Sequence, residues 1–451
     1  MNDEERRILK HTQMTETPVE KLVISLAVPT IISMMVSSLY NMADTFFMAR
    51  INASATAAVG IIFSLMSIIQ AVGFFFGHGS GNYISRKLGA RENKDAEEMS
   101  AVGFFSAFAG GCLICLLGLL FLKPLARFLG ATETVMPYAE QYMGIILIGA
   151  PFMTASLVVN NQLRFQGNAL FAMLGIATGA VINIGLDPLF IFGFGMGIRG
   201  AALATIISQF ISFCILLIGS AKSSSITIRL KNFKPSKEKY AGVIQGGTPS
   251  LSRNALACLG MIVLNRTAGI YGDSALAAMA IVQRFSFMIF AATLGLGQGF
   301  QPVCGFNYGA KLYDRVRKAY VFCVLVSTCF LSVSMILGLV FAPQIIGFFC
   351  QDQKDVLEIG IKTMRLQWLS FPLLGFMVTS NMFLENINKY AQATITAMAR
   401  QGLFLIPLLF ILPRFAGLTG IIISQPISDY LAALLTAVLT VPVLRDLKAR
   451  S

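Results

Sequence analysis

The sequence predicts an all-α membrane protein with twelve transmembrane helices in two six-helix lobes. Charged residues make up only 13% of the 451 residues, against about 25% in a typical soluble domain. Apolar residues make up 55% and the mean hydropathy is +0.71, so the chain holds more apolar surface than one water-facing globule can bury. This composition excludes a soluble enzyme or regulator. An internal repeat then divides the helices into two lobes.

The predicted helices are apolar runs separated by charged or Gly/Pro-rich connections. A crossing of the hydrocarbon core takes about 20 residues, and each run is long enough for one. The predicted helices are residues 22–49, 57–78, 99–122, 135–160, 170–192, 201–220, 246–271, 275–298, 319–342, 359–382, 391–412 and 418–441. An even number of crossings places both termini on the same side of the membrane.

Lysine and arginine in the connections predict that both termini are cytoplasmic, because positively charged loops stay inside. On this assignment 23 of the 35 lysines and arginines fall in inner segments and six in outer loops. The net charge of +13 is therefore a topology signal, and no polar domain is available to present a basic surface to nucleic acid. The charged residues 1–21 exclude a cleaved signal peptide with an apolar core.

Residues in the two halves correspond at offsets between 219 and 221. The matched pairs are Pro29 with Pro249, Gly79 with Gly299, Pro151 with Pro372, Asn160 with Asn381, Pro188 with Pro407, and Gly197 with Gly417. Each half has six helices, so both halves insert in the same direction and are related by a pseudo-twofold axis along the membrane normal. We predict an N-terminal lobe at 1–220, a cytoplasmic linker at 221–245 and a C-terminal lobe at 246–451.

Four acidic residues fall inside predicted spans, where an ionised carboxylate costs several kcal/mol and is rarely kept without a use. They are Asp44, Asp187, Glu385 and Asp429. Asn183 lies one turn before Asp187 on the same helix face. Pro188 cannot donate to the carbonyl of Ile184, so we expect a kink and a free acceptor there. The carboxylate of Asp187, the amide of Asn183 and the free carbonyl together predict a proton or small-cation site. Asp44 is the second carboxylate to which we assign a functional role. The alternative is that each aspartate only bonds within its own bundle.

The remaining acids, Glu385 and Asp429, lie nearer to predicted helix ends, where we expect the side chains to reach water. A role for them as second-lobe substrate or ion contacts is a weaker prediction. Basic residues inside spans occur in the second half: Arg253, Arg266, Arg284 and Arg400. An acidic first lobe and a basic second lobe would suit a cationic solute bound on the acidic side. Alternatively, these arginines extend to the interface or pair with the two acids.

Sequence motifs for other chemistry are missing or misplaced. No phosphate-binding P-loop occurs, so nucleotide hydrolysis is not the energy source within this chain. His11 and His78 are too few and too far apart to predict a metal cluster.

Three segments together resemble the MATE (multidrug and toxic compound extrusion) family. They are residues 29–61, residues 295–310 with the motifs GLGQGFQP and FNYGA, and residues 199–209 with RGAALATIISQ. The resemblance covers nearly the whole chain. It implies two six-helix lobes, alternating access, and export of cationic or amphiphilic drugs driven by H⁺ or Na⁺ entry.

The resemblance also implies site residues. In members of the DinF-like branch the first lobe holds a cation site, which maps here onto Asp44, Asn183, Asp187 and Thr205. The associated bend maps onto Pro29, and we expect Pro188 to be a second hinge. The seventh predicted helix has no carboxylate, which favours a first-lobe mechanism over second-lobe Na⁺ coupling.

We therefore expect a multidrug efflux antiporter in the inner membrane of a bacterium, coupled to H⁺ or, as the alternative, to Na⁺. We expect a monomer whose partners are small drugs and membrane lipid, with no nucleic acid and no cofactor besides the coupling ion. Three alternatives stay open. A lipid-linked oligosaccharide flippase shares the two-lobe plan but needs a basic cleft, a membrane enzyme needs a convergent His, Cys or carboxylate cluster, and an ion channel would conduct without the drug.

Overall fold

A computed structural model describes residues 3–51, 53–223, 226–349 and 354–450. These residues form helices and connections, with no β-strand among them. Nine helical stretches within this part of the chain are long and apolar enough to cross a membrane. The chain is therefore a multi-pass helical membrane protein, and the predicted all-α class is confirmed.

The nine stretches differ from the twelve predicted helices for physical reasons. The predicted seventh helix is more polar than the others, and the predicted tenth is divided between two shorter helices on either side of residues 369–370. The predicted eleventh and twelfth form one stretch, Tyr390–Ala449, with a non-helical backbone at Gly417. The number of crossings stays a prediction.

The chain divides into two compact units. Unit 1 comprises Met1–Glu16 and Val28–Gly247, and unit 2 comprises Thr17–Ala27 and Thr248–Ser451. Compared with the predicted lobes, unit 2 therefore contains residues 17–27, and unit 1 contains the predicted linker. Helix α2 (Val19–Ala49) begins in unit 2 and continues in unit 1, and helix α9 (Lys237–Gly269) does the reverse.

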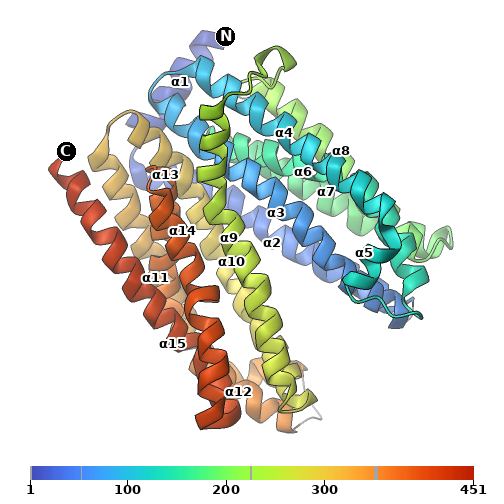
Figure 1. The fold of residues 1–451 in the computed structure, drawn as a ribbon. Coiled ribbons are helices and arrows are strands. Elements are labelled where there is room, and N and C mark those ends of the chain that lie inside the picture. Colours follow the sequence, from blue (N-terminus) through green and yellow to red (C-terminus); the bar gives the residue numbers. More distant parts are fainter. Residues whose placement is uncertain (1–2, 52, 224–225, 350–353, 451) are drawn as a thin grey trace. The chain divides into compact units, whose positions relative to one another are not determined.

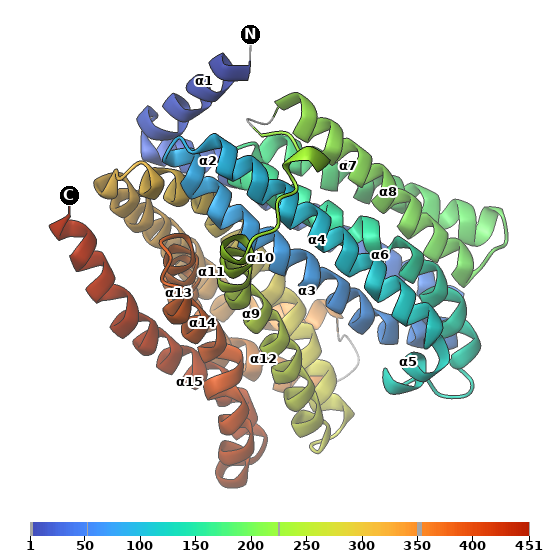
Figure 2. The ribbon, with the colours of Figure 1, turned by 45° about the horizontal axis from the view of Figure 1, so that its top comes forward.

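Helix α6 is the central helix of unit 1. It packs against α3, α4 and α8 (Figures 1 and 2), and most of its length is buried. Its side chains Met143, Ile146 and Leu147 form a core with Ile62 and Ile69 of α3. The helices of unit 1 besides α2 are α1 (Asp3–Glu16), α3 (Ala53–Gly89), α4 (Asn93–Leu120), α5 (Leu122–Phe128), α6 (Met136–Phe165), α7 (Ala169–Pro188), the π-helix η1 (Leu189–Gly193), α8 (Ile198–Ser223) and the short η2 (Leu230–Asn232).

Helix α13 has the central place in unit 2, where it packs against α10, α11 and α15 (Figure 2). Trp368 stacks on Phe371 with 4.7 Å between ring centroids, and its indole Nε1 donates to Ser286 Oγ at 2.9 Å. The helices of unit 2 besides α9 are α10 (Asp273–Gly309), α11 (Tyr313–Phe349), α12 (Lys354–Trp368), α13 (Phe371–Asn386), α14 (Tyr390–Met398), the π-helix η3 (Ala399–Phe404) and α15 (Leu405–Ala449).

The internal repeat is visible in backbone geometry and in hydrogen bonds. Left-handed backbone conformations recur at the same offset: Arg91 (φ 63°) with Lys311 (φ 60°), and Gly197 with Gly417 (both φ 56°). The side chain of Asn160 donates to the carbonyl of Ala172 at 2.9 Å, and that of Asn381 donates to Ala393 at 2.6 Å. The two halves therefore use the same local structures at corresponding positions.

Gly79 and Gly299, the second glycines of the repeated motifs Gly77-x-Gly79 and Gly297-x-Gly299, lie against the first turns of α9 and α2. A Cβ on Gly79 would overlap the backbone of Val243, which lies in the part of α9 that belongs to unit 1. A Cβ on Gly299 would lie 2.5 Å from the backbone N and Cα of Ala27, in the part of α2 that belongs to unit 2. The motif glycines are therefore required where two helix backbones approach closely.

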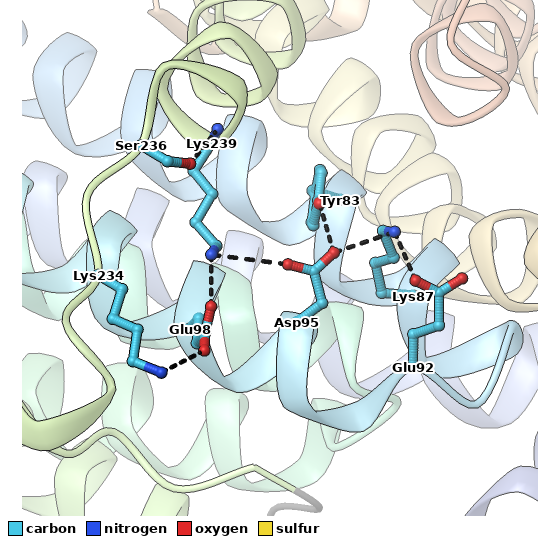
Figure 3. Close-up of polar contacts among 8 residues, drawn as sticks. All are labelled: Tyr83, Lys87, Glu92, Asp95, Glu98, Lys234, Ser236 and Lys239. Atoms are coloured by element: carbon cyan, nitrogen blue, oxygen red, sulfur yellow. Dashed lines mark hydrogen bonds and ion pairs between the residues drawn. The ribbon is translucent and has the colours of Figure 1, made fainter.

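The first turns of α4 hold the linker in place through carboxylates (Figure 3). Glu98 accepts hydrogen bonds from Lys234 at 2.9 Å and from Lys239 at 2.5 Å. Asp95 accepts from the hydroxyl of Tyr83 at 2.6 Å and lies 3.7 Å from the Lys239 ammonium group. The side chains of Lys239 and Glu98 are only 10% and 14% exposed, so this pair is shielded from solvent. The cluster fixes residues 234–239 to unit 1.

Helix α1 packs on unit 1 ahead of the first span. Lys10 Nζ donates to the carbonyl of Gly167 at 2.7 Å, and the imidazole of His11 bonds to the carbonyl of Gly89 at 3.1 Å. Burial lowers the pKa of Lys10 to about 8, because removal from water disfavours the charged ammonium form.

Candidate functional site

A group of buried polar side chains lies between α7 and α8 in unit 1. Asn183 and Asp187 of α7 and Thr205 of α8 are each no more than 1% exposed. The Asn183 amide donates to the Asp187 carboxylate at 3.0 Å, in the orientation that also lets its oxygen accept from the Thr205 backbone N–H at 3.3 Å. The one-turn spacing of Asn183 and Asp187 places both on one helix face, as the sequence predicts.

The backbone beside this group widens after Pro188. The chain passes from α7 directly into η1, where the Phe194 N–H bonds to the carbonyl of Leu189 and the Met196 N–H to that of Phe190. Such π-helical turns are rare and often lie at functional sites. The helix therefore continues through Pro188 with a changed hydrogen-bond pattern. The hinge role of this proline stays a prediction.

Asp44 of α2 extends the group. Its side chain is half-buried, and its Oδ1 atom is buried without a hydrogen-bond partner in the described part of the chain. Its charge acts on Asp187, so the two carboxyl groups share one electrostatic environment. Tyr40 of α2 and Tyr142 of α6 lie beside Thr205 and both aspartates. We call these six residues the acidic site.

The structure thus brings together the four residues that the family resemblance mapped onto a cation site, and it adds two tyrosines. Tyr142 was missed, since nothing in its sequence neighbourhood distinguishes a site tyrosine from a core tyrosine. Pro29 lies on the same helix as Asp44, and its carbonyl accepts a hydrogen bond from Ser33 at 3.0 Å. Its role as a hinge stays a prediction, as do the coupling roles of the aspartates.

The acids of unit 2 do not reach water, which corrects the expectation for them. Glu385 is 0% exposed and Asp429 is 1% exposed. Asp429 lies in the middle of α15, far from both ends of that helix and from both ends of the predicted span 418–441. Glu385 accepts a hydrogen bond from Gln301 at 3.4 Å and is held within unit 2.

Of the four arginines inside predicted spans, Arg400 follows the alternative interpretation and pairs with Asp429, whereas Arg266 and Arg284 are exposed. Arg400 Nε donates to Asp429 Oδ1 at 2.7 Å. Arg253 donates to Asn381 at 3.1 Å and interacts electrostatically with Glu385. Unit 2 therefore contains the ion pair of Arg400 with Asp429, whereas the acidic site of unit 1 has two carboxyl groups and no basic side chain among the contacts described above.

No group of three or more His, Cys, Asp or Glu side chains that could hold a metal ion occurs within the described ranges. His78 packs edge-on against Phe74 and Phe165, at 5.7 and 6.0 Å between ring centroids. The acidic site instead offers carboxylate, amide and hydroxyl oxygens, which suit a proton or a hard monovalent cation.

The fold and this site define a class: multi-pass helical membrane proteins built from a repeated half, with ionisable groups buried inside the spans. The MatE family model matches residues 29–189 and 249–411, which are corresponding parts of the two halves. The chain therefore belongs to the MatE family, and the resemblance found in the sequence is confirmed.

Relatives and solved structures match over nearly the full length. The chain is 29% identical to the multidrug export protein MepA of Staphylococcus aureus (strain MSSA476), over 96% of this chain and 95% of the relative. It is 28% identical to MepA of Staphylococcus saprophyticus, with the same shares covered. It is 25% identical to a crystal structure of MATE in complex with MaL6, with a TM-score of 0.92 over 97% of this chain and 99% of that one. An outward-facing MATE family multidrug resistance transporter matches with a TM-score of 0.91 at 25% identity, over 97% of this chain and 98% of that one.

Proposed function

We propose that this protein is a multidrug efflux antiporter that exports lipophilic or cationic drugs and dyes by alternating access, coupled to H⁺ entry at the acidic site. The single observation that carries the proposal is the pair of carboxyl groups in unit 1, with Asp187 inside the apolar stretch Ala169–Gly193 and Asp44 on α2, which begins with the apolar stretch Val19–Tyr40. Similarity to the export protein MepA supports drugs as the substrates. Na⁺ is the alternative coupling ion.

The chemistry of the site supports exchange between an ion and a drug. The Asp44 Oδ1 atom is a buried acceptor without a partner in the described chain, and a proton or bound cation stabilises such an atom. A drug cation provides the same stabilisation. The site therefore binds either the coupling ion or the drug more favourably than it binds both at once. This competition couples entry of the ion to export of the drug.

The energy of one coupling ion is sufficient for export. A proton that moves down a potential of about 100 mV releases about 2.3 kcal/mol. Each tenfold gradient of a neutral solute costs about 1.4 kcal/mol. A cationic drug that leaves against the same potential needs a pH gradient or further protons.

The remaining parts of the proposal concern location and assembly. The excess of lysine and arginine in inner segments supports cytoplasmic termini in the inner membrane of a bacterial cell. We propose that the protein works as a monomer in contact with lipid, needs no cofactor besides the coupling ion, and is not an enzyme.

The test is dye efflux from proteoliposomes that contain the purified full chain, with H⁺ and Na⁺ gradients imposed separately. We expect efflux under the H⁺ gradient. Efflux only under the Na⁺ gradient would replace the proton with Na⁺ as the coupling ion. If no dye moves but a lipid-linked oligosaccharide changes leaflet, the chain is a flippase. Dye-independent ion flux far above carrier rates would indicate a channel.

Two substitutions test the site itself. Asp44→Asn and Asp187→Asn should each reduce gradient-driven efflux about tenfold or more, because each removes an intramembrane charge worth several kcal/mol. Asp446→Asn is the matched control, since Asp446 is exposed near the end of α15, where it pairs with Arg450. If both site variants export dye normally with an unchanged gradient dependence, the coupling role is wrong.

A further inference from the structure

Unit 2 contains a buried polar cluster that the proposed mechanism does not use. Its centre is Asp429 of α15, which accepts three hydrogen bonds. Arg400 of η3 donates to Oδ1 at 2.7 Å, Gln425 of α15 donates to the same oxygen at 3.0 Å, and Ser370 donates to Oδ2 at 2.6 Å. Both carboxylate oxygens are therefore satisfied by the protein, so this carboxylate positions its neighbours.

Arg400 is held by one edge only. Its Nε binds Asp429, and its guanidinium carbon lies 5.4 Å from the ring centroid of Phe290 of α10. No described residue accepts a hydrogen bond from its two terminal nitrogens, Nη1 and Nη2. The side chain is 24% exposed, compared with 2% for that of Asp429. The guanidinium group is thus oriented by a carboxylate and an aromatic ring while its outer nitrogens stay accessible.

The depth of this group in the span makes accessible donors significant. Arg400 lies near the middle of the predicted crossing 391–412. On that prediction it is near the middle of a hydrocarbon core about 30 Å thick. Unpaired N–H donors at that depth require water or a polar solute, because lipid tails cannot accept hydrogen bonds.

We propose that Arg400 is a recognition site for the carboxylate of aromatic amphiphilic substrates, with Asp429 as its positioning residue. The two terminal nitrogens of a guanidinium group form a planar fork that matches both oxygens of a carboxylate. The Phe290 ring offers a stacking surface for the aromatic part of the same molecule. Unit 2 thereby extends the substrate range from cations to zwitterions. This inference rests on the proposed export of drugs and names a substrate class for it.

The test compares two forms of one dye: a rhodamine as its ethyl ester, which is a cation, and the same rhodamine as its free acid, which is a zwitterion. Affinity is measured by fluorescence anisotropy on the purified full chain in detergent. Initial transport rates are measured in proteoliposomes. Because the two dyes differ only at the carboxyl group, the ratio of acid to ester reports recognition of the carboxylate.

Three variants separate recognition from folding. The double variant Arg400→Gln/Asp429→Asn keeps the charge balance of unit 2, and we expect its acid-to-ester affinity ratio to fall about tenfold. Arg400→Lys keeps the charge but loses the planar fork, so an intermediate ratio is expected. Arg284→Gln is the control, because Arg284 is an exposed arginine of α10 outside the cluster.

The outcomes are distinct. An acid-to-ester ratio within twofold of the wild type in both Arg400 variants would overturn the inference, as would an equal loss of both dyes. Circular dichroism on the same samples identifies a variant that fails to fold, and Arg400→Lys then decides the question. If the wild type binds both dyes and the Arg400 variants lower the acid-to-ester affinity ratio as expected, but the wild type transports neither dye, the proposed function fails and the carboxylate site stands.

Discussion

Replacing Gly299 with alanine tests the close approach of α10 and the start of α2 in unit 2. The added Cβ would lie 2.5 Å from the backbone N and Cα of Ala27 and 2.8 Å from its Cβ. Carbon atoms in contact prefer about 3.5–4.0 Å, so a backbone must move by about 1 Å. Overpacking of this kind costs about 1–3 kcal/mol. Alanine also gains about 1 kcal/mol over glycine as a helix former, so the net destabilisation is up to about 2 kcal/mol.

The matched control is Gly347→Ala in α11 of the same unit. The single neighbour of its added Cβ lies at an ordinary 3.8 Å, so the free energy of unfolding should stay equal or rise by up to about 1 kcal/mol. Unfolding in mixed detergent micelles, followed by fluorescence of Trp368, reports on unit 2 because the chain has one tryptophan. If both variants have equal unfolding free energies, the close approach does not limit packing and the reasoning is refuted.

Two further predictions concern unit 1. Glu98→Gln should speed hydrogen exchange of residues 234–247 about tenfold, because it weakens a shielded ion pair with Lys239, while Glu133→Gln, in an ion pair with both side chains mostly exposed, should change little. Equal rates in the two variants would contradict this. Between about pH 8 and 10.5 the unfolded chain binds more protons at Lys10 than the folded chain, so stability should rise with pH by at most about 3 kcal/mol. Lys10→Gln should remove that rise, measured as the free energy of unfolding, and a rise of the same size in this variant would contradict the assignment.

Local patterns in the sequence were sufficient for the helices and for part of the acidic site. Apolar runs identify the spans, and one-turn spacing places Asn183 and Asp187 on one face regardless of how the helices pack. The repeat could be read because corresponding positions use the same glycines, prolines and asparagines. Thr205 entered only through the family resemblance, because no local pattern links it to α7.

The remaining features depend on the register between distant helices, which no local pattern contains. Tyr142 joins the acidic site because α6 packs against α8, and Arg400 meets Asp429 because η3 packs against α15. The exchange of helix starts between the two units depends in the same way on backbone approach at Gly79 and Gly299. Exposure was wrongly expected for Asp429, because its contacts with Arg400 and Ser370 join elements that no local pattern places together.

The comparison of repeated and unrepeated residues separates scaffold from function. Asn160 and Asn381 occupy corresponding positions and make the same bond to the following helix, so this interaction serves packing in both halves. The position of Asp187, in contrast, corresponds to Ile406 at an offset of 219, so the second half has no copy of this carboxylate. A carboxylate is costly inside a membrane, and the fold of the second half forms without one at this position. The restriction of this carboxylate to unit 1 therefore supports the proposal that unit 1 exchanges the coupling ion and that unit 2 recognises other substrate groups.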